Sequence, residues 1–207
     1  MEYRAVRNRC AVDLNSFDLP ISRGEALAIL AGKGFRIIEV DLVALARECI
    51  GKSRYWRGAR PSQAPAVVDC SSFMKWLYGE RGIWLPRLSI EQRAFGEAVN
   101  LSDIIAGDLI FVSGARDYYL NDPADGVGHV GMASGGGTVI HAANIKAGVI
   151  ETSLEKFADK ADFRGAGRYI PGGREVLTLE TPIEREIETA DHIKWIIRRS
   201  LPEAEKT

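Results

Sequence analysis

Cysteine, histidine and surplus charge are all scarce in this 207-residue chain. Its three cysteines, Cys10, Cys49 and Cys70, are odd in number and irregularly spaced, which argues against a disulfide framework and favours a reducing compartment. Lysine and arginine total 27 against 28 for aspartate and glutamate, so the net charge of −1 gives no electrostatic basis for binding nucleic acid. The longest apolar stretches, such as residues 26–30, are too short to span a membrane.

The amino-terminal residues 1–17 contain charges and lack the apolar run of a secretory signal peptide. We therefore expect a cytoplasmic protein, with export by a non-Sec route as the alternative. Neither a membrane nor a cofactor is an expected partner. With 46% hydrophobic and 27% charged residues, the composition is that of a globular protein able to bury a full core.

Helical patterns fill the first half of the chain and short β-rich runs fill the second half. Residues 1–22 look irregular, and helices are predicted over residues 23–34, 41–50, 70–78 and from Ser89 onward. Strands are predicted over residues 107–114, 128–134, 138–144, 148–153 and 165–170. Helices followed by strands indicate an α+β domain.

The chain divides into three predicted parts. We expect an N-terminal extension over residues 1–40, a main domain over residues 41–172 and a mainly helical C-terminal extension over residues 173–207. Within the last part, residues 181–207 predict one charged amphipathic helix that packs on the body or on a second subunit. The sequence does not indicate the oligomeric state.

Cys70 lies where the stretch VVDCSSFMKW predicts the start of a helix. Asp69 and Ser71 are favourable N-cap residues, and an apolar helical face follows them. The positive end of the helix dipole favours a thiolate at this position, and the thiolate is the nucleophilic form of cysteine. A small buried core residue is the alternative for Cys70, since free cysteine is among the most buried residue types.

Two of the three histidines lie in adjacent predicted strands. If residues 135–137 form a three-residue hairpin loop, Gly131 faces His141, and His129 faces Ala143. His129 and His141 then point to one face of the sheet as diagonal neighbours, roughly 7 Å apart at Cα. A register slipped by one residue would put them on opposite faces.

These residues suit nucleophilic catalysis. A nucleophile needs a base within hydrogen-bond reach, and the base needs an orienting third group. His129 would take the proton of the Cys70 thiol to form a thiolate–imidazolium pair, and His141 would hold the tautomer of His129. The Cys70 backbone N–H would donate to an oxyanion. The alternative chemistry is a zinc site, because one cysteine and two histidines are a legitimate set of three ligands.

Six short motifs, in order along the chain, resemble those of the NlpC/P60 cysteine peptidases. They are YWRG at 55–58, DCSSF at 69–73, PRLS at 86–89, AGDLIFV at 106–112, GHVGM at 128–132 and VIHAA at 139–143. The resemblance implies a papain-like α+β fold, in which a helix-borne cysteine packs on an antiparallel β-sheet, with residues 41–172 as the catalytic domain and the C-terminal helix as an addition.

The resemblance also implies a site and a reaction. Cys70 would be the nucleophile, His129 the general base and His141 the third residue, while Tyr55 would place a hydroxyl near the nucleophile. Asp69 and Ser71 would hold a free substrate amine, with Arg87 close by. A carboxylate paired with an ammonium away from water gives selectivity for a free N-terminus.

The implied substrate is a peptidoglycan stem peptide or muropeptide fragment. The expected bond joins γ-D-glutamate to a diamino acid, and its cleavage would pass through a thioester. A thiol acyltransferase, or an amidase acting on a non-wall substrate with the same fold, is the alternative, and an idle binding module is a further one.

The sequence departs from the family pattern at three places. Arg57 stands where the family usually has a glycine, Ser72 replaces a common glycine or alanine, and the loop over residues 113–127 is long. All three lie near the expected cleft, so they leave the identity of the substrate open.

Overall fold

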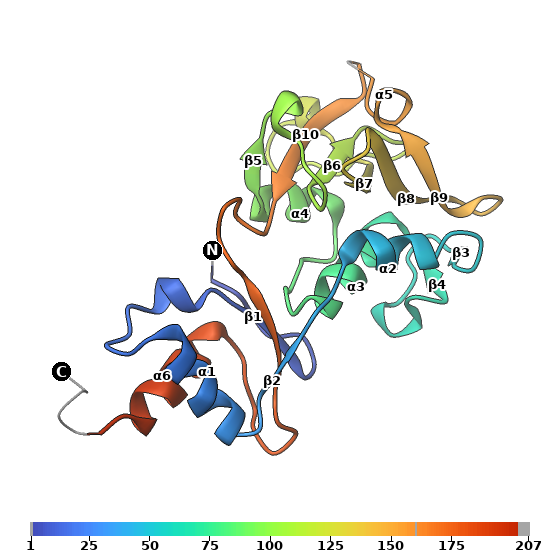
Figure 1. The fold of residues 1–207 in the computed structure, drawn as a ribbon. Coiled ribbons are helices and arrows are strands. Elements are labelled where there is room, and N and C mark those ends of the chain that lie inside the picture. Colours follow the sequence, from blue (N-terminus) through green and yellow to red (C-terminus); the bar gives the residue numbers. More distant parts are fainter. Residues whose placement is uncertain (1, 160, 203–207) are drawn as a thin grey trace. The chain divides into compact units, whose positions relative to one another are not determined.

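The structure is a computed structural model that describes residues 2–159 and 161–202. These residues form two compact units, each taken by itself below (Figure 1). The terminal unit comprises residues 2–40, 79–84 and 171–202, and the central unit comprises residues 41–78, 85–159 and 161–170. The described residues of the two expected extensions, 2–40 and 173–202, thus belong to the same unit.

The terminal unit is built on a three-stranded antiparallel sheet. Its strand order is β1 (Arg9–Val12), β11 (Leu177–Glu180) and β2 (Arg36–Ile38). The prediction that residues 1–22 are irregular is wrong, because β1 pairs with β11, which lies far along the chain. No local pattern reveals a strand whose partner is so distant, since hydrophobic alternation over four residues is a weak signal.

Two helices contact each other in the terminal unit, α1 (Arg23–Gly32) and α6 (Ala190–Ser200) (Figure 1). The predicted start of α1 is confirmed, since Ser22 caps it in a reciprocal bond with Glu25. The prediction of one helix over 181–207 is wrong in extent, because α6 begins only at Ala190 and a turn at Pro182 precedes it. Residues 203–207 lie outside the described residues.

The central unit contains a six-stranded antiparallel sheet that confirms the predicted strands. Its strand order is β5 (Glu97–Val99), β10 (Phe163–Arg168), β6 (Leu109–Val112), β7 (His129–Ala133), β8 (Thr138–Asn144) and β9 (Gly148–Ser153). β5 was not predicted, because its three residues continue a helical pattern and acquire strand geometry only by pairing with β10.

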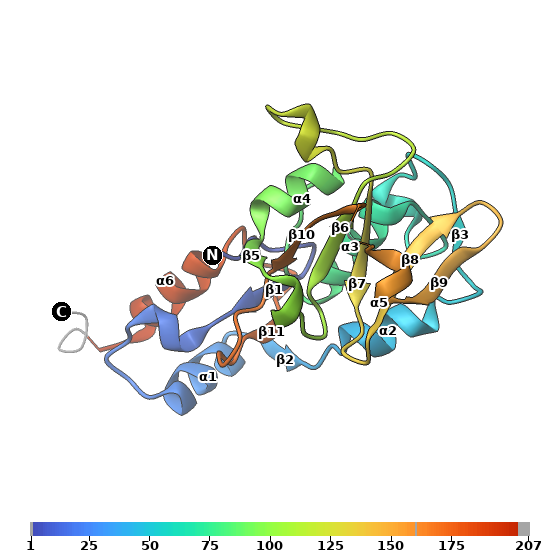
Figure 2. The same ribbon diagram turned by 90° about the horizontal axis from the view of Figure 1, so that it is seen from above.

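Four helices accompany this sheet: α2 (Leu42–Glu48), α3 (Cys70–Glu80), α4 (Ser89–Phe95) and the short α5 (Leu154–Phe157). Figures 1 and 2 agree in placing α3 beneath strands β6 to β8. The helix predicted over residues 41–50 is confirmed as α2, with Asp41 as its N-cap and not as its first helical residue. α4 differs slightly, because Leu88 occupies the cap position and Ser89 is the first helical residue.

Short elements complete the chain. The remaining strands, β3 (Arg54–Tyr55) and β4 (Val67–Val68), pair in parallel and bring Tyr55 opposite Val68, two residues before Cys70. The 3₁₀ helices η1 (Leu14–Phe17), η2 (Pro61–Gln63), η3 (Leu101–Asp103) and η4 (Pro123–Asp125) lie in connecting segments.

The register between β7 and β8 is the one that the three-residue hairpin loop predicts. Met132 pairs with Ile140, and Ala133 pairs with Val139. Side chains alternate between the two faces of a sheet, so this register puts His129 and His141 on one face. That face also carries an apolar cluster of Ile110, Val112, Ala133, Val139, Phe157 and Ala158.

Gly131 lies opposite His141 in this register, and its lack of a side chain leaves room for the neighbouring His141. A Cβ added at Gly131 would come 2.5 Å from Val139 Cγ1 and 3.0 Å from His141 Cβ. We therefore expect Gly131→Ala to lower the free energy of unfolding by about 1–3 kcal/mol, as overpacking does, which denaturant titration would measure.

Gly136 in the same hairpin is the matched control. Its added Cβ would meet nothing closer than Ser134 Oγ at 3.9 Å, so Gly136→Ala should change stability by less than about 0.5 kcal/mol. Equal stability of the two variants would contradict the packing described for Gly131.

Candidate active site

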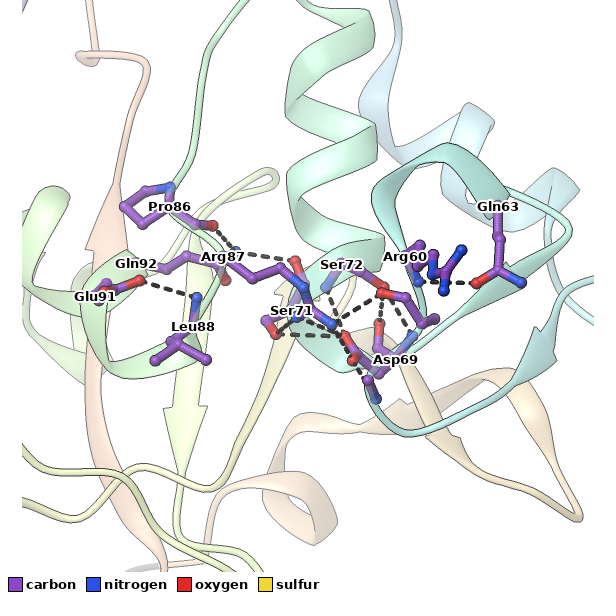
Figure 3. A network of polar contacts seen from close by, with 12 residues as sticks. Arg60, Gln63, Asp69, Ser71, Ser72, Pro86, Arg87, Leu88, Glu91 and Gln92 are labelled. Carbon is purple, nitrogen blue, oxygen red and sulfur yellow. Dashed lines mark hydrogen bonds and ion pairs between the residues drawn. The ribbon is translucent and has the colours of Figure 1, made fainter.

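The start of α3 is fixed by a reciprocal pair of hydrogen bonds between Asp69 and Ser72. The Ser72 backbone N–H donates to Asp69 Oδ1 at 2.8 Å, and the Asp69 N–H donates to Ser72 Oγ at 2.8 Å (Figure 3). This is the geometry of a capping box in which serine stands at the third helical position. The Ser72 departure from the family pattern therefore serves to hold Cys70 in the first turn of α3.

The Asp69 carboxylate is buried and receives further donors. Arg87 donates to Oδ1 at 3.1 Å and to Oδ2 at 2.5 Å (Figure 3). The Gly58 N–H donates to Oδ2 at 2.9 Å. The Ser71 hydroxyl lies at 3.4 Å from Oδ1 and accepts from Arg87 at 2.8 Å. The structure thus brings together three of the expected binding residues, but it pairs the Asp69 carboxylate with Arg87 in the free site.

Gln92 of α4 is a supporting residue that the sequence did not single out. Its side chain is fully buried, and its Nε2 donates to Ser71 O at 2.9 Å and to Pro86 O at 3.0 Å (Figure 3). The two bonds tie the first turn of α3 to the segment that carries Arg87. Only the close approach of α3 and α4 gives Gln92 this role, so a pattern within α4 could not have identified it.

His129 and His141 meet as the register predicts. His129 Nε2 lies 2.9 Å from His141 Nδ1, and His141 Nε2 lies 3.1 Å from Thr152 Oγ1. The Phe157 ring packs against both imidazoles, with centroid distances of 5.5 and 4.7 Å. Thr152 comes from β9 and was not predicted, because finding it requires the register of a second hairpin.

Burial keeps the thiol and both imidazoles neutral. It lowers the pKa of His129 to about 4, and burial together with the neighbouring His129 lowers the pKa of His141 to about 3. Burial, and secondarily the charge of Asp69, raises the pKa of Cys70 to about 11, despite N–H donors from Val130 and Ser71. In the free site the structure therefore favours a neutral pair over the thiolate–imidazolium pair expected from the sequence.

Cys70 and His129 line one cavity of about 630 Å³ within the central unit. The expected binding residues Tyr55, Asp69, Ser71 and Arg87 line it too. His141 does not line this cavity and reaches it through its contact with His129. The volume is in the range of small-molecule and peptide sites.

Tyr55 is suited to donate a hydrogen bond inside this cavity. Burial raises its pKa, the nearby Cys70 and Asp69 add to the effect, and Arg57 partly offsets it. The phenol therefore keeps its proton at neutral pH, as an oxyanion donor must. Arg116 and Tyr118 of the long loop also line the cavity, and the sequence had not assigned them a role.

A metal site does not emerge from the described part of the chain, where no three His, Cys, Asp or Glu side chains gather in a way that could hold an ion. His129 and His141 instead direct a nitrogen at each other. Across residues 2–159 and 161–202, no helix has both the length and the apolar character needed to cross a membrane.

A helix-start cysteine that shares a cavity with a strand-borne histidine, itself in contact with a second histidine, is typical of the papain-like class of α+β folds. Within that class, the chain belongs to the NlpC/P60 family, whose family model matches residues 51–168. A crystal structure of an NlpC/P60 family protein from Bacillus cereus superposes with a TM-score of 0.52 at 27% identity, covering 66% of this chain and 42% of that one. The predicted family and fold are confirmed.

Two curated relatives carry names that describe an activity. The chain is 36% identical over 153 residues to a probable endopeptidase from Corynebacterium glutamicum, covering 73% of this chain and 60% of that protein. It is 31% identical over 132 residues to a gamma-D-glutamyl-L-lysine dipeptidyl-peptidase from Bacillus cereus, covering 63% of this chain and 36% of that protein. The chain thus spans 60% or less of the length of either relative.

The neutral state of Cys70 can be tested by alkylation. With the pKa of Cys70 at about 11, the thiolate fraction and hence the rate of alkylation by iodoacetamide should rise about tenfold per pH unit from about pH 6 to pH 9. The rate would be followed by mass spectrometry of the peptide containing Cys70, with Cys49→Ala as the matched control. A rate that stays constant from about pH 5 upward would show a resting thiolate–imidazolium pair instead.

Proposed function

We propose that this protein is a cysteine peptidase that hydrolyses an amide bond in peptidoglycan-derived peptides. The bond proposed is that between γ-D-glutamate and a diamino acid. The observation that carries the proposal is the shared cavity of Cys70 and His129, with His129 backed by His141 and Thr152. The name of the probable endopeptidase supports a peptidase, and the name of the gamma-D-glutamyl-L-lysine dipeptidyl-peptidase supports the type of bond.

The hydrogen-bond pattern suggests how the proton moves. His129 Nε2 is engaged with His141, so the other ring nitrogen, Nδ1, is left to accept the thiol proton. The charge that develops on His129 is then stabilised if its Nε2–H donates to His141 Nδ1 while His141 Nε2–H donates to Thr152 Oγ1. A base that starts neutral is the form that general-base catalysis requires.

The reaction then follows in two halves. Cys70 Sγ attacks the amide carbonyl, and the Cys70 N–H and the Tyr55 hydroxyl donate to the oxyanion. The C–N bond breaks as His129 returns its proton to the leaving amine, which leaves a thioester on Cys70. Water, activated by His129, attacks the thioester and releases the acid and the free thiol.

Recognition of a free substrate amine is proposed for the surroundings of Asp69. Since Arg87 already donates to both carboxylate oxygens, the substrate ammonium is proposed to take the place of the Ser71 hydroxyl. At 3.4 Å that hydroxyl makes the longest contact with the carboxylate. The ammonium would replace a weak neutral contact by a charge-assisted one.

Two alternative functions differ from this proposal in the acceptor of the acyl group or in the substrate. A thiol acyltransferase would pass the same thioester to an acceptor other than water, and an amidase would act on a non-wall amide. The charged lining of the cavity, with Arg57, Asp69, Arg87 and Arg116, favours a polar peptide over an acyl chain. The cytoplasmic location stays a prediction.

The proposal predicts selective cleavage of L-Ala-γ-D-Glu-meso-diaminopimelate. The wild type should cleave the free-amine peptide and discriminate against the N-acetylated one, because acetylation removes the ammonium that Asp69 would bind. Cys70→Ala should reduce the rate roughly 10³-fold or more, as loss of a nucleophile does. Products would be quantified by liquid chromatography and mass spectrometry.

Cys49→Ala is the matched control for this assay. Cys49 is a buried cysteine at the end of α2 that does not line the cavity, so its substitution should leave the rate within a few fold of wild type. Undiminished cleavage by Cys70→Ala would rule out the nucleophile, and the absence of cleavage by wild type would rule out the wall-peptide substrate.

A further inference from the structure

Two arginines line the active-site cavity without a carboxylate partner. Arg57 and Arg116 are both exposed, and among the described residues no carboxylate forms an ion pair with either. A third arginine of the cavity, Arg87, differs because Asp69 neutralises it. With Cys70 and His129 neutral, the cavity holds three guanidinium groups against one carboxylate, an excess of two positive charges.

Arg57 is held close to the nucleophile by the backbone on both sides of it. Before it, the Trp56 N–H donates to Val68 O at 2.8 Å, and after it, the Gly58 N–H donates to Asp69 Oδ2 at 2.9 Å. Both acceptors lie within two residues of Cys70. Arg57 therefore occupies a determined place beside the reacting centre, although its guanidinium has no acidic partner there.

Arg116 is carried by an ordered part of the long loop. The Gly114 N–H donates to Asp117 Oδ1 at 2.7 Å, and Tyr118 and Val127 exchange two backbone hydrogen bonds at 2.9 Å. Arg116 thus lies between two fixed points. Tyr118, which follows it, also lines the cavity, so this end of the loop forms a wall of the cavity.

We propose that Arg57 and Arg116 form a carboxylate-binding subsite that selects substrates bearing a free carboxylate beside the scissile amide. This inference rests on the proposed peptidase function and adds a specificity to it. Guanidinium groups bind carboxylates with paired, charge-assisted hydrogen bonds, and Arg57 and Arg116 line the same cavity as Cys70. Amidated peptides would lose this interaction.

Two carboxylates of the proposed substrate have the required chemistry. One is the α-carboxylate of the γ-linked glutamate, and the other is the side-chain carboxylate of diaminopimelate. A peptide with isoglutamine in place of glutamate removes the first, and a peptide with lysine in place of diaminopimelate removes the second. Comparison of the three peptides identifies which carboxylate is bound.

The kinetic test compares wild type with Arg57→Gln and Arg116→Gln. We expect the wild type to favour the carboxylate-bearing peptide in kcat/KM by about tenfold or more, the value of a hydrogen bond between charged groups, and either variant to lose most of that preference through KM. Arg60→Gln is the matched control, since Arg60 lies three residues away and does not line the cavity. Equal rates on all peptides by the wild type would overturn the proposal.

A second test does not depend on the peptidase function. Iodoacetate and iodoacetamide differ by one carboxylate, and both alkylate Cys70. We expect the iodoacetate-to-iodoacetamide rate ratio to fall several-fold in Arg57→Gln and Arg116→Gln, to stay unchanged in Arg60→Gln, and to decrease for wild type in high salt. A fall in the ratio without peptide cleavage would retain the subsite and reject the proposed function. An unchanged ratio would reject the subsite even if the peptides are cleaved.

Discussion

The buried carboxylate of Asp69 connects three segments of the candidate site: the start of α3, the segment of Arg87 and the segment that follows Tyr55. It caps the helix that begins with Cys70, it accepts two hydrogen bonds from Arg87, and it accepts the N–H of Gly58 at the end of the Tyr55 segment. Removing it would leave an uncompensated, partly buried guanidinium and two unsatisfied N–H groups, which is costlier than losing one exposed ion pair. The placement of Cys70, Arg87 and Gly58 thus depends on one side chain.

Neutral and charged groups lie in different parts of the candidate site. Burial favours neutral Cys70, His129 and His141, whereas the guanidinium groups of Arg57 and Arg116 remain charged at the wall of the cavity. In the proposed mechanism, the thiol and imidazole become charged only as the proton moves, and the contacts of His141 with His129 and Thr152 would stabilise that charge. The permanent positive charges are then available for binding an anionic substrate group.

Short sequence patterns correctly predicted helix starts and a hairpin, which depend on residues adjacent in the sequence. Two helix starts, at Ser22 and Asp41, and the hairpin at residues 135–137 were predicted from adjacent residues. The predicted hairpin register correctly places His129 next to His141. Sequence patterns did not predict features that depend on a residue far along the chain or on the burial of a side chain. The pairing of β1 with β11, the contact of Thr152 with His141 and the neutral state of Cys70 all depend on packing that no short stretch encodes. The family resemblance predicted that Arg87 lies close to Asp69. It did not predict that Arg87 donates hydrogen bonds to both oxygens of the Asp69 carboxylate.

The proposed mechanism requires that Cys70 form a thioester during amide hydrolysis. Rapid quenching of the protein with the free-amine γ-D-glutamyl peptide, followed by mass spectrometry, tests it most directly. We expect an adduct on the peptide containing Cys70 whose mass equals the acyl part of the substrate, and no adduct in Cys70→Ala. Cleavage that proceeds without any adduct in the wild type, and at an equal rate in Cys70→Ala, would contradict it.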